Sequence, residues 1–146
     1  MIPAFDAGGN LPPGIHPASW DEVMTRYATN ARRRELLNGL LDALRSLKHA
    51  GCRAAYLDGS FVTAKELPGD FDACWEIAGV DPSRLDGELL DFSGRRAAQK
   101  ARYGGELFPI ETAAEPSGTT FLDYFQRDRD TGQPKGVIAI DLGALP

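Results

Sequence analysis

The residues of this sequence that are best suited to joint chemistry are two carboxylates, Asp70 and Asp72, in the segment GDFDACWEI. Side chains two residues apart on a β-strand point to the same face, so an Asp-x-Asp at a strand start sets both carboxylates side by side. Such neighbours repel each other and raise one pKa unless a cation neutralises them. Hard oxygen ligands suit Mg²⁺ or Mn²⁺, which also bridge substrate phosphates. The spacing therefore predicts a divalent-cation site.

A phosphate-binding turn is predicted shortly before these carboxylates, where the apolar segment CRAAYLD ends in Gly59 and Ser60. Gly59 lets the backbone approach a phosphate closely, and the Ser60 hydroxyl and the following amides can donate to phosphate oxygens. Thr63 and Lys65, in the connector to the carboxylates, are the other predicted nucleotide-binding residues. This division of labour suits phosphoryl or nucleotidyl transfer, in which metal ions and donors stabilise the attacking and leaving oxygens.

The segment YLDGSFVTAKELPGDFDACWE resembles the signature of the polymerase-β-like nucleotidyltransferase superfamily, a hydrophobic strand, Gly-Ser, a short connector and Asp-x-Asp. Nearly the whole chain also resembles a small bacterial family known mainly as a nucleotidyltransferase-like domain of unknown function. The resemblance implies that Asp70 and Asp72 are catalytic metal ligands. It implies that Gly59 and Ser60 form the phosphate-binding turn.

Such folds usually take a third carboxylate from a later strand. Glu106 of GGELFP is the first candidate for this ligand and Asp141 of VIAIDL is the second. Glu106 would complete the metal site or activate the acceptor, and the alternative is an exposed residue at a strand start. The chain departs from the family pattern at Phe61-Val62-Thr63, where a basic residue is common, and at Gly69, where Ser is common. Lys65 is the basic residue left nearby as a phosphate partner.

The resemblance implies a Mg²⁺- or Mn²⁺-dependent enzyme that moves a nucleoside monophosphate from a nucleoside triphosphate such as ATP to a hydroxyl of a protein, RNA or small molecule. Likeness to small nucleotidyltransferases that work beside toxin proteins extends this to a toxin–antitoxin or defence setting with a protein partner. Two other classes stay open. One is a catalytically weak module that binds a nucleotide or a partner protein, and the other is a structural domain with a surface Asp-x-Asp. The structural domain predicts no nucleotide-dependent stabilisation at all.

Interleaved strands and helices predict an α+β sandwich, one mixed sheet of about four strands with helices packed on it. Ser19 and Glu22 have capping-box spacing and predict a helix from Trp20 to about Ala28. Asn30 is expected to begin a second helix with a leucine stripe, which Gly51 ends. Strands are also expected at 52–58, 71–77, 106–110 and 137–142, and the third of these should lie at a sheet edge because of Pro109. A helix is expected at 86–103, and an amphipathic segment at 119–129.

With 146 residues, of which 42% are hydrophobic, the chain is long enough for one core. We expect a Gly/Pro-rich arm at 1–18 without regular structure and a single domain at 19–146. The net charge of −5 gives no global basic footprint, so a nucleic-acid partner would need a local patch. Cys52 and Cys74 are expected to be reduced core thiols. No leader-like or membrane-spanning stretch occurs, which predicts a cytoplasmic protein without a membrane partner.

Other conspicuous residues are interpreted as structural. Asp58, beside Gly59, is expected to hold the turn through backbone hydrogen bonds. The run Arg32–Arg34 and the cluster at 95–102 are expected to be solvated helix faces, although the second could face a nucleotide or acceptor. Four aromatic residues lie in segments with a packing period and are expected in the core rather than as base-stacking platforms. They are Trp20, Trp75, Tyr124 and Phe125.

Overall fold

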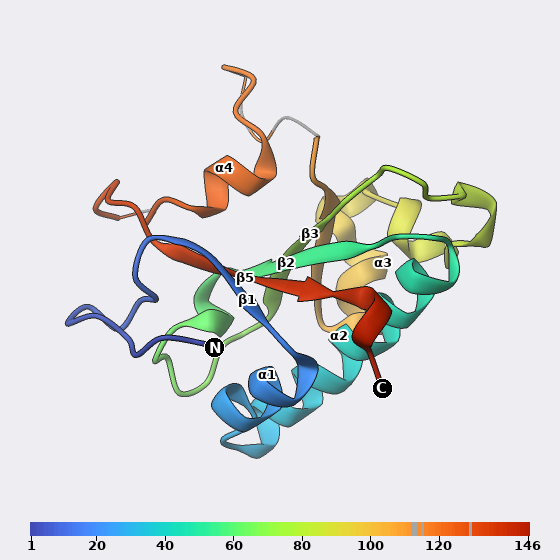
Figure 1. The fold of residues 1–146 in the computed structure, drawn as a ribbon. Helices are drawn as coiled ribbons and strands as arrows, with labels where there is room; N and C mark the ends of the chain where they lie inside the picture. Colours follow the sequence, from blue (N-terminus) through green and yellow to red (C-terminus); the bar gives the residue numbers. More distant parts are fainter. Residues whose placement is uncertain (112–113, 115, 129) are drawn as a thin grey trace.

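A mixed sheet with strand order β1-β5-β2-β3-β4 runs through the molecule (Figure 1). The computed structural model describes residues 1–111, 114, 116–128 and 130–146. The strands are β1 (Gly14–Ala18), β2 (Ala54–Asp58), β3 (Phe71–Trp75), β4 (Gly105–Pro109) and β5 (Gly136–Asp141). β1 is parallel to β5 and β3 to β4, whereas β2 is antiparallel to both β3 and β5. The predicted α+β class with one mixed sheet is confirmed, as is the edge position of β4.

The strand β1 lies in the segment predicted to be an irregular arm, so the sheet has five strands rather than the expected four. Its register runs from Gly14 opposite Gly136 to Ala18 opposite Ile140. At a sheet edge its side chains stay largely exposed, and its half-buried positions hold His16 and Ala18 rather than large apolar residues. The period by which strands are identified in a sequence is therefore absent.

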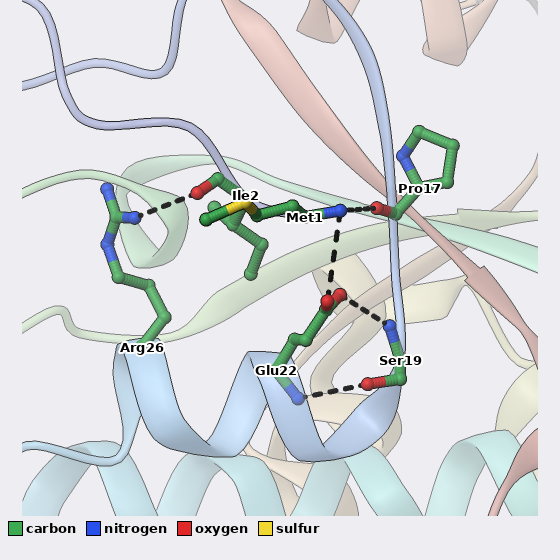
Figure 2. Close-up of polar contacts among 6 residues, drawn as sticks. All are labelled: Met1, Ile2, Pro17, Ser19, Glu22 and Arg26. Atoms are coloured by element: carbon green, nitrogen blue, oxygen red, sulfur yellow. Dashed lines mark hydrogen bonds and ion pairs between the residues drawn. The ribbon is translucent and has the colours of Figure 1, made fainter.

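The first residues are tied to β1 and to helix α1 (Trp20–Tyr27) by polar contacts (Figure 2). The Met1 ammonium donates to the Pro17 carbonyl at 3.3 Å and lies 3.8 Å from the Glu22 carboxylate. Glu22 also accepts from the Ser19 amide, and the Ser19 hydroxyl accepts from the Glu22 amide, so the predicted capping box is confirmed. The ion pair is exposed and contributes little to stability.

Helix α2 (Ala31–His49) supplies most of the core and begins at Asn30, whose side chain accepts from the Arg33 amide as predicted. Its leucine stripe packs against the apolar residues of the central strands. Position 39 of this helix requires glycine, because the Tyr103 carbonyl lies so close that a Cβ at this position would collide with it. The buried leucines are Leu36, Leu37, Leu40, Leu44 and Leu47.

The helix expected at 86–103 is broken in the structure. A 3₁₀ turn covers Gly87–Leu90 and helix α3 spans Ser93–Tyr103, with left-handed backbone at Gly94, Arg95 and Arg96, whose φ values are 57°, 57° and 62°. The Asp91 carboxylate accepts from the amide and hydroxyl of Ser93, a local turn that competes with helix. The further 3₁₀ turns are Ser60–Val62, Pro82–Arg84 and Leu142–Ala144.

The two faces of the sheet are covered differently. Helices α1 to α3 lie on one side, and helix α4 (Phe121–Phe125) lies on the other (Figure 1). Alternation along β4 explains this, because Leu107 joins the core on the first face whereas the Phe108 ring stacks on Phe121 from the second. No helix of the described residues is long and apolar enough to cross a membrane.

Candidate functional site

Carboxylates gather on the α4 side of the sheet, where β2, β3 and β4 lie side by side. Asp58 is in register with Asp72, and Asp72 is in register with Glu106. Asp70 lies two residues before Asp72 in the chain, close enough to Glu106 for their charges to interact. In-register Cβ atoms on one face are about 4.5–5.5 Å apart, so these charges repel unless they are neutralised. The fold thus brings together the three predicted carboxylates and adds a fourth, Asp58.

A cleft of about 870 Å³ opens above this row, within the range of about 300–1,000 Å³ typical of small-molecule sites. A neighbouring hollow of about 980 Å³, lined by part of 118–134, shares Tyr124, Arg127 and Asp128 with the cleft but contains none of the strand carboxylates. The cleft is lined by Gly59, Ser60 and Thr63, by Asp70, Asp72 and Glu106, by Arg95, Arg96, Lys100, Arg127 and Lys135, by Phe108, Phe121, Tyr124 and Phe125, and by Asn10, Ala114, Asp128 and Asp130.

Asp58 lies under the cleft and is fully buried. Among the described residues, neither of its carboxyl oxygens has a hydrogen-bond partner, so the prediction that Asp58 holds the turn through hydrogen bonds is wrong. Burial raises the pKa of Asp58 well above its ordinary value, the Asp72 charge raises it further, and Lys135 opposes both effects. An uncharged Asp58 relieves the repulsion that an ionised carboxylate would exert on Asp72.

Replacing Asp58 with Asn is expected to change how stability depends on pH. Because the folded state binds the Asp58 proton more tightly than the unfolded chain, the wild-type unfolding free energy falls as pH rises through the raised pKa, by up to about 1.4 kcal/mol per pH unit. Asn cannot ionise and removes this slope. Urea unfolding of both proteins at about pH 5 and about pH 8, with chelator, measures it. If the unfolding free energies of the two proteins changed equally with pH, a raised pKa of Asp58 would be contradicted.

The other carboxylates differ in how they are compensated. Burial raises the pKa of Asp70, and the Glu106 charge adds to this, while Lys100, Arg32 and Lys65 lower it. Glu106 is paired at 2.8 Å with the Lys100 ammonium and at 3.4 Å with the Arg96 guanidinium. The predicted third ligand is therefore already engaged by two cations.

The predicted phosphate turn follows β2 directly and contacts the acid row. Gly59 has φ 77°, and a Cβ at this position would collide with the Asp72 carboxylate. The Thr63 hydroxyl donates to the Ser60 carbonyl at 2.6 Å and closes the 3₁₀ turn. Gly59, Ser60 and Thr63 all line the cleft, whereas the exposed Lys65 does not and reaches the site only through its charge.

Gly59→Ala is expected to destabilise the fold by about 1–3 kcal/mol, because Ala is strained at positive φ and its methyl group would displace the Asp72 carboxylate. The same change should weaken binding of Mg²⁺ with nucleotide. Gly118→Ala is the matched control, since Gly118 also has positive φ and nothing in the described part of the chain lies within 4 Å of its Cβ position. Urea unfolding compares the two variants with wild type. Equal losses of unfolding free energy would mean that the collision with Asp72 does not destabilise the fold.

Arg33, which the sequence analysis assigned to a solvated face, is buried and holds the turn from behind. It is 3% exposed, and its guanidinium donates to the carbonyls of Phe61 at 2.7 Å, Thr63 at 3.0 Å and Lys65. The Tyr27 hydroxyl donates to the neighbouring Val62 carbonyl at 3.1 Å. A signal was available in the sequence, because Arg33 lies three and four residues before the first two leucines of the stripe and so shares its face.

Cationic side chains form another part of the lining, here called the cationic rim. Arg95, Arg96 and Lys100 line it, and the left-handed turn at 94–96 carries two of them. Arg95 and Lys100 are exposed, as expected of a solvated face, whereas Arg96 is half-buried. Arg102 of the same helix instead pairs with Asp86 and Glu88 outside the cleft. Arg127 and Lys135 join from the segment after α4 and were not singled out in the sequence.

Asp141, the second candidate for the third carboxylate, lies at the wrong end of the sheet. It is in register with Ala54, at the opposite end of β2 from Asp58. Its carboxylate accepts from the Gly143 amide at 2.9 Å and begins the C-terminal 3₁₀ turn. Asp141 therefore does not belong to this site.

The donor set fits a cation that arrives with a ligand better than one enclosed by protein. Among the described residues, no group of three or more His, Cys, Asp or Glu is arranged to hold a metal ion. Mg²⁺ commonly takes one or two carboxylates together with water and substrate phosphates. Asp70 and Asp72, in a cleft that cationic side chains also line, match that pattern in the chemistry of their donor atoms.

Comparison with known proteins gives a family but no activity. No curated protein and no solved structure matches the chain. A family described as "Family of unknown function (DUF6932)" matches residues 3–141, a span that includes every residue of the cleft. The chain therefore belongs to this family of unknown function, DUF6932.

Proposed function

We propose that the cleft binds a nucleoside triphosphate with Mg²⁺ or Mn²⁺ and transfers its nucleoside monophosphate to an acceptor hydroxyl. One observation supports this above all: the in-register carboxylates of β2, β3 and β4 share one cleft with a glycine turn and a cationic rim. Adjacent acids suit a divalent cation, and separate cations suit the phosphates that it bridges.

Each group has a role in this proposal. Asp70 and Asp72 would hold the cation, which when bound neutralises charge on the carboxylates and phosphates. The Gly59–Ser60 turn and the Thr63 hydroxyl would receive the β- and γ-phosphates. Glu106 was predicted to complete the metal site or to activate the acceptor. In this proposal it instead positions Lys100 and Arg96, with which it forms ion pairs.

In the transfer step, the acceptor oxygen attacks the α-phosphorus and forms the new P–O bond. The bond from the α-phosphorus to the bridging oxygen breaks, and pyrophosphate leaves with that electron pair. The acceptor proton passes to a cleft carboxylate or to water. In this proposal Lys100 and Arg96, which line the cleft, would take up charge on the leaving pyrophosphate. Phosphoryl transfer depends mainly on electrostatic stabilisation of this kind.

The identity of the acceptor stays a prediction. A hydroxyl of a protein, RNA or small molecule, and a toxin–antitoxin or defence setting, come from the resemblance alone. The cationic rim supplies the local basic patch that a nucleic-acid acceptor would need in a chain with net charge −5.

A catalytically weak nucleotide-binding module is the second candidate function. It is favoured by the two ion pairs of Glu106, because a carboxylate that is paired with two cations is poorly suited to serve as the third metal ligand. This protein would bind the triphosphate with Mg²⁺ and act through a partner, without transferring a nucleotide.

The test uses each nucleoside triphosphate labelled at the α-phosphate, with Mg²⁺ or Mn²⁺, in lysate of the source cell. Label on a discrete protein or RNA band supports the transferase and identifies its acceptor class. Thermal unfolding with unlabelled nucleotide separates the alternatives, because a ligand that binds only the folded state raises its apparent stability. Stabilisation without transfer supports the binding module, and the absence of both would overturn the nucleotide site.

A further inference from the structure

An aromatic wall forms the second half of the cleft. It consists of Phe108 on β4 and of Phe121, Tyr124 and Phe125 on α4. Phe108 and Phe121 stack with centroids 3.9 Å apart, and Phe125 is 5.9 Å from Phe121. Tyr124 ends the row, edge-to-face with Phe125 at 5.4 Å.

The wall has a buried base, Phe108, and a more open part on α4. Phe121, Tyr124 and Phe125 are half-buried, and α4 stands apart from the other helices on its own face of the sheet (Figure 1). The expectation that Tyr124 and Phe125 lie in the core is therefore wrong. Aromatic rings left partly open in a cleft have surface available for a flat ligand.

The aromatic wall and the acid row are continuous. Phe108 follows Glu106 by two residues on β4, so both side chains point to the same face one pleat apart. The Arg96 guanidinium bridges the two halves, since it pairs with Glu106 and lies 5.1 Å from the centroid of the Phe108 ring. One half of the cleft thus suits a polyanion with a divalent cation, and the other suits a flat aromatic ring.

We propose that the base of the bound nucleoside triphosphate stacks on this wall, with Tyr124 as its main contact. The inference rests on the proposed function and adds what it leaves open, namely where the base of the nucleotide binds. Stacking responds to the π-face and not to a hydrogen-bond pattern, so the site should accept several bases. Purines, with the larger ring system, should bind more tightly than pyrimidines.

Tyr124→Leu and Tyr124→Phe form the matched pair of variants. Leu keeps an apolar side chain but removes the ring, whereas Phe keeps the ring and removes only the hydroxyl. Calorimetric titration with ATP and with inorganic tripolyphosphate, both in Mg²⁺, should show wild type binding ATP more tightly. Tyr124→Leu should weaken ATP binding roughly tenfold and leave tripolyphosphate unchanged, while Tyr124→Phe stays near wild type.

The controls separate this inference from the proposed function. If wild type binds ATP and tripolyphosphate equally, or if Tyr124→Leu weakens both to the same degree, base stacking is overturned while the triphosphate site stands. If wild type binds neither compound, both proposals fail. Equal unfolding midpoints of the three proteins verify that the comparison is between folded states.

Discussion

Asp70→Asn combined with Asp72→Asn is expected to lower nucleotide transfer by at least about 10²-fold while the protein stays folded. Both side chains line the cleft beside the glycine turn, and the amides that replace them carry no charge to attract a divalent cation. Removing like charges from one face also relieves repulsion, so the unfolding free energy should stay equal or rise. The α-phosphate transfer assay and urea unfolding measure the two effects.

Glu66→Gln is the matched control for this double variant, because it removes an exposed carboxylate from the same connector outside the cleft. We expect it to transfer label like wild type. Nucleotide with Mg²⁺ should stabilise Glu66→Gln against unfolding but not the double variant. That result would assign nucleotide binding to the carboxylate pair even if no transfer were found. Unchanged transfer in the double variant would contradict the assignment.

Arg33→Ala is expected to destabilise the protein by about 3–5 kcal/mol. The change removes a buried guanidinium and leaves the carbonyls of Phe61, Thr63 and Lys65 without their donor. It also removes the contacts of the guanidinium with the rings of Phe61, at 4.9 Å, and Tyr27, at 5.6 Å. Because these carbonyls belong to the predicted phosphate turn, nucleotide binding should weaken even in conditions where the variant stays folded.

Arg34→Ala is the control, since this neighbour in the same helix is exposed and should change stability by no more than about 0.5 kcal/mol. Arg33→Lys should lie between the two, because an ammonium lacks the planar fork that reaches several carbonyls. Urea unfolding of the three variants gives the order. A loss below about 1 kcal/mol for Arg33→Ala would mean that water replaces the guanidinium at little cost.

Much of the helical layer could be predicted because its signals are local. The capping box at Ser19 and Glu22, the Asn30 side chain at the start of α2, and the leucine period lie within a few residues of the structure they determine. β5 and the edge strand β4 were also found, with bounds within one or two residues. The carboxylates Asp70, Asp72 and Glu106 share the cleft as expected.

The remaining features depend on partners far along the chain. β1 has no period of its own and exists because β5 pairs with it. Asp58 becomes buried only when Asp72 lies opposite in the sheet, and the break at 94–96 arises where the chain turns toward the cleft. The aromatic residues of α4 have a helical period, but nothing in that period indicates that their outer faces remain open.

The position of β5 determines the order in which this sheet can assemble. β5 lies between β1 and β2, yet it follows them in the chain by more than a hundred and by about eighty residues respectively. During synthesis, both neighbours must wait with unpaired backbone edges until residues 136–141 emerge. Long-range pairing of this kind slows folding and exposes strand edges to other chains. A nascent chain that stops short of β5 would therefore be a substrate for chaperones or for aggregation rather than a smaller version of the fold.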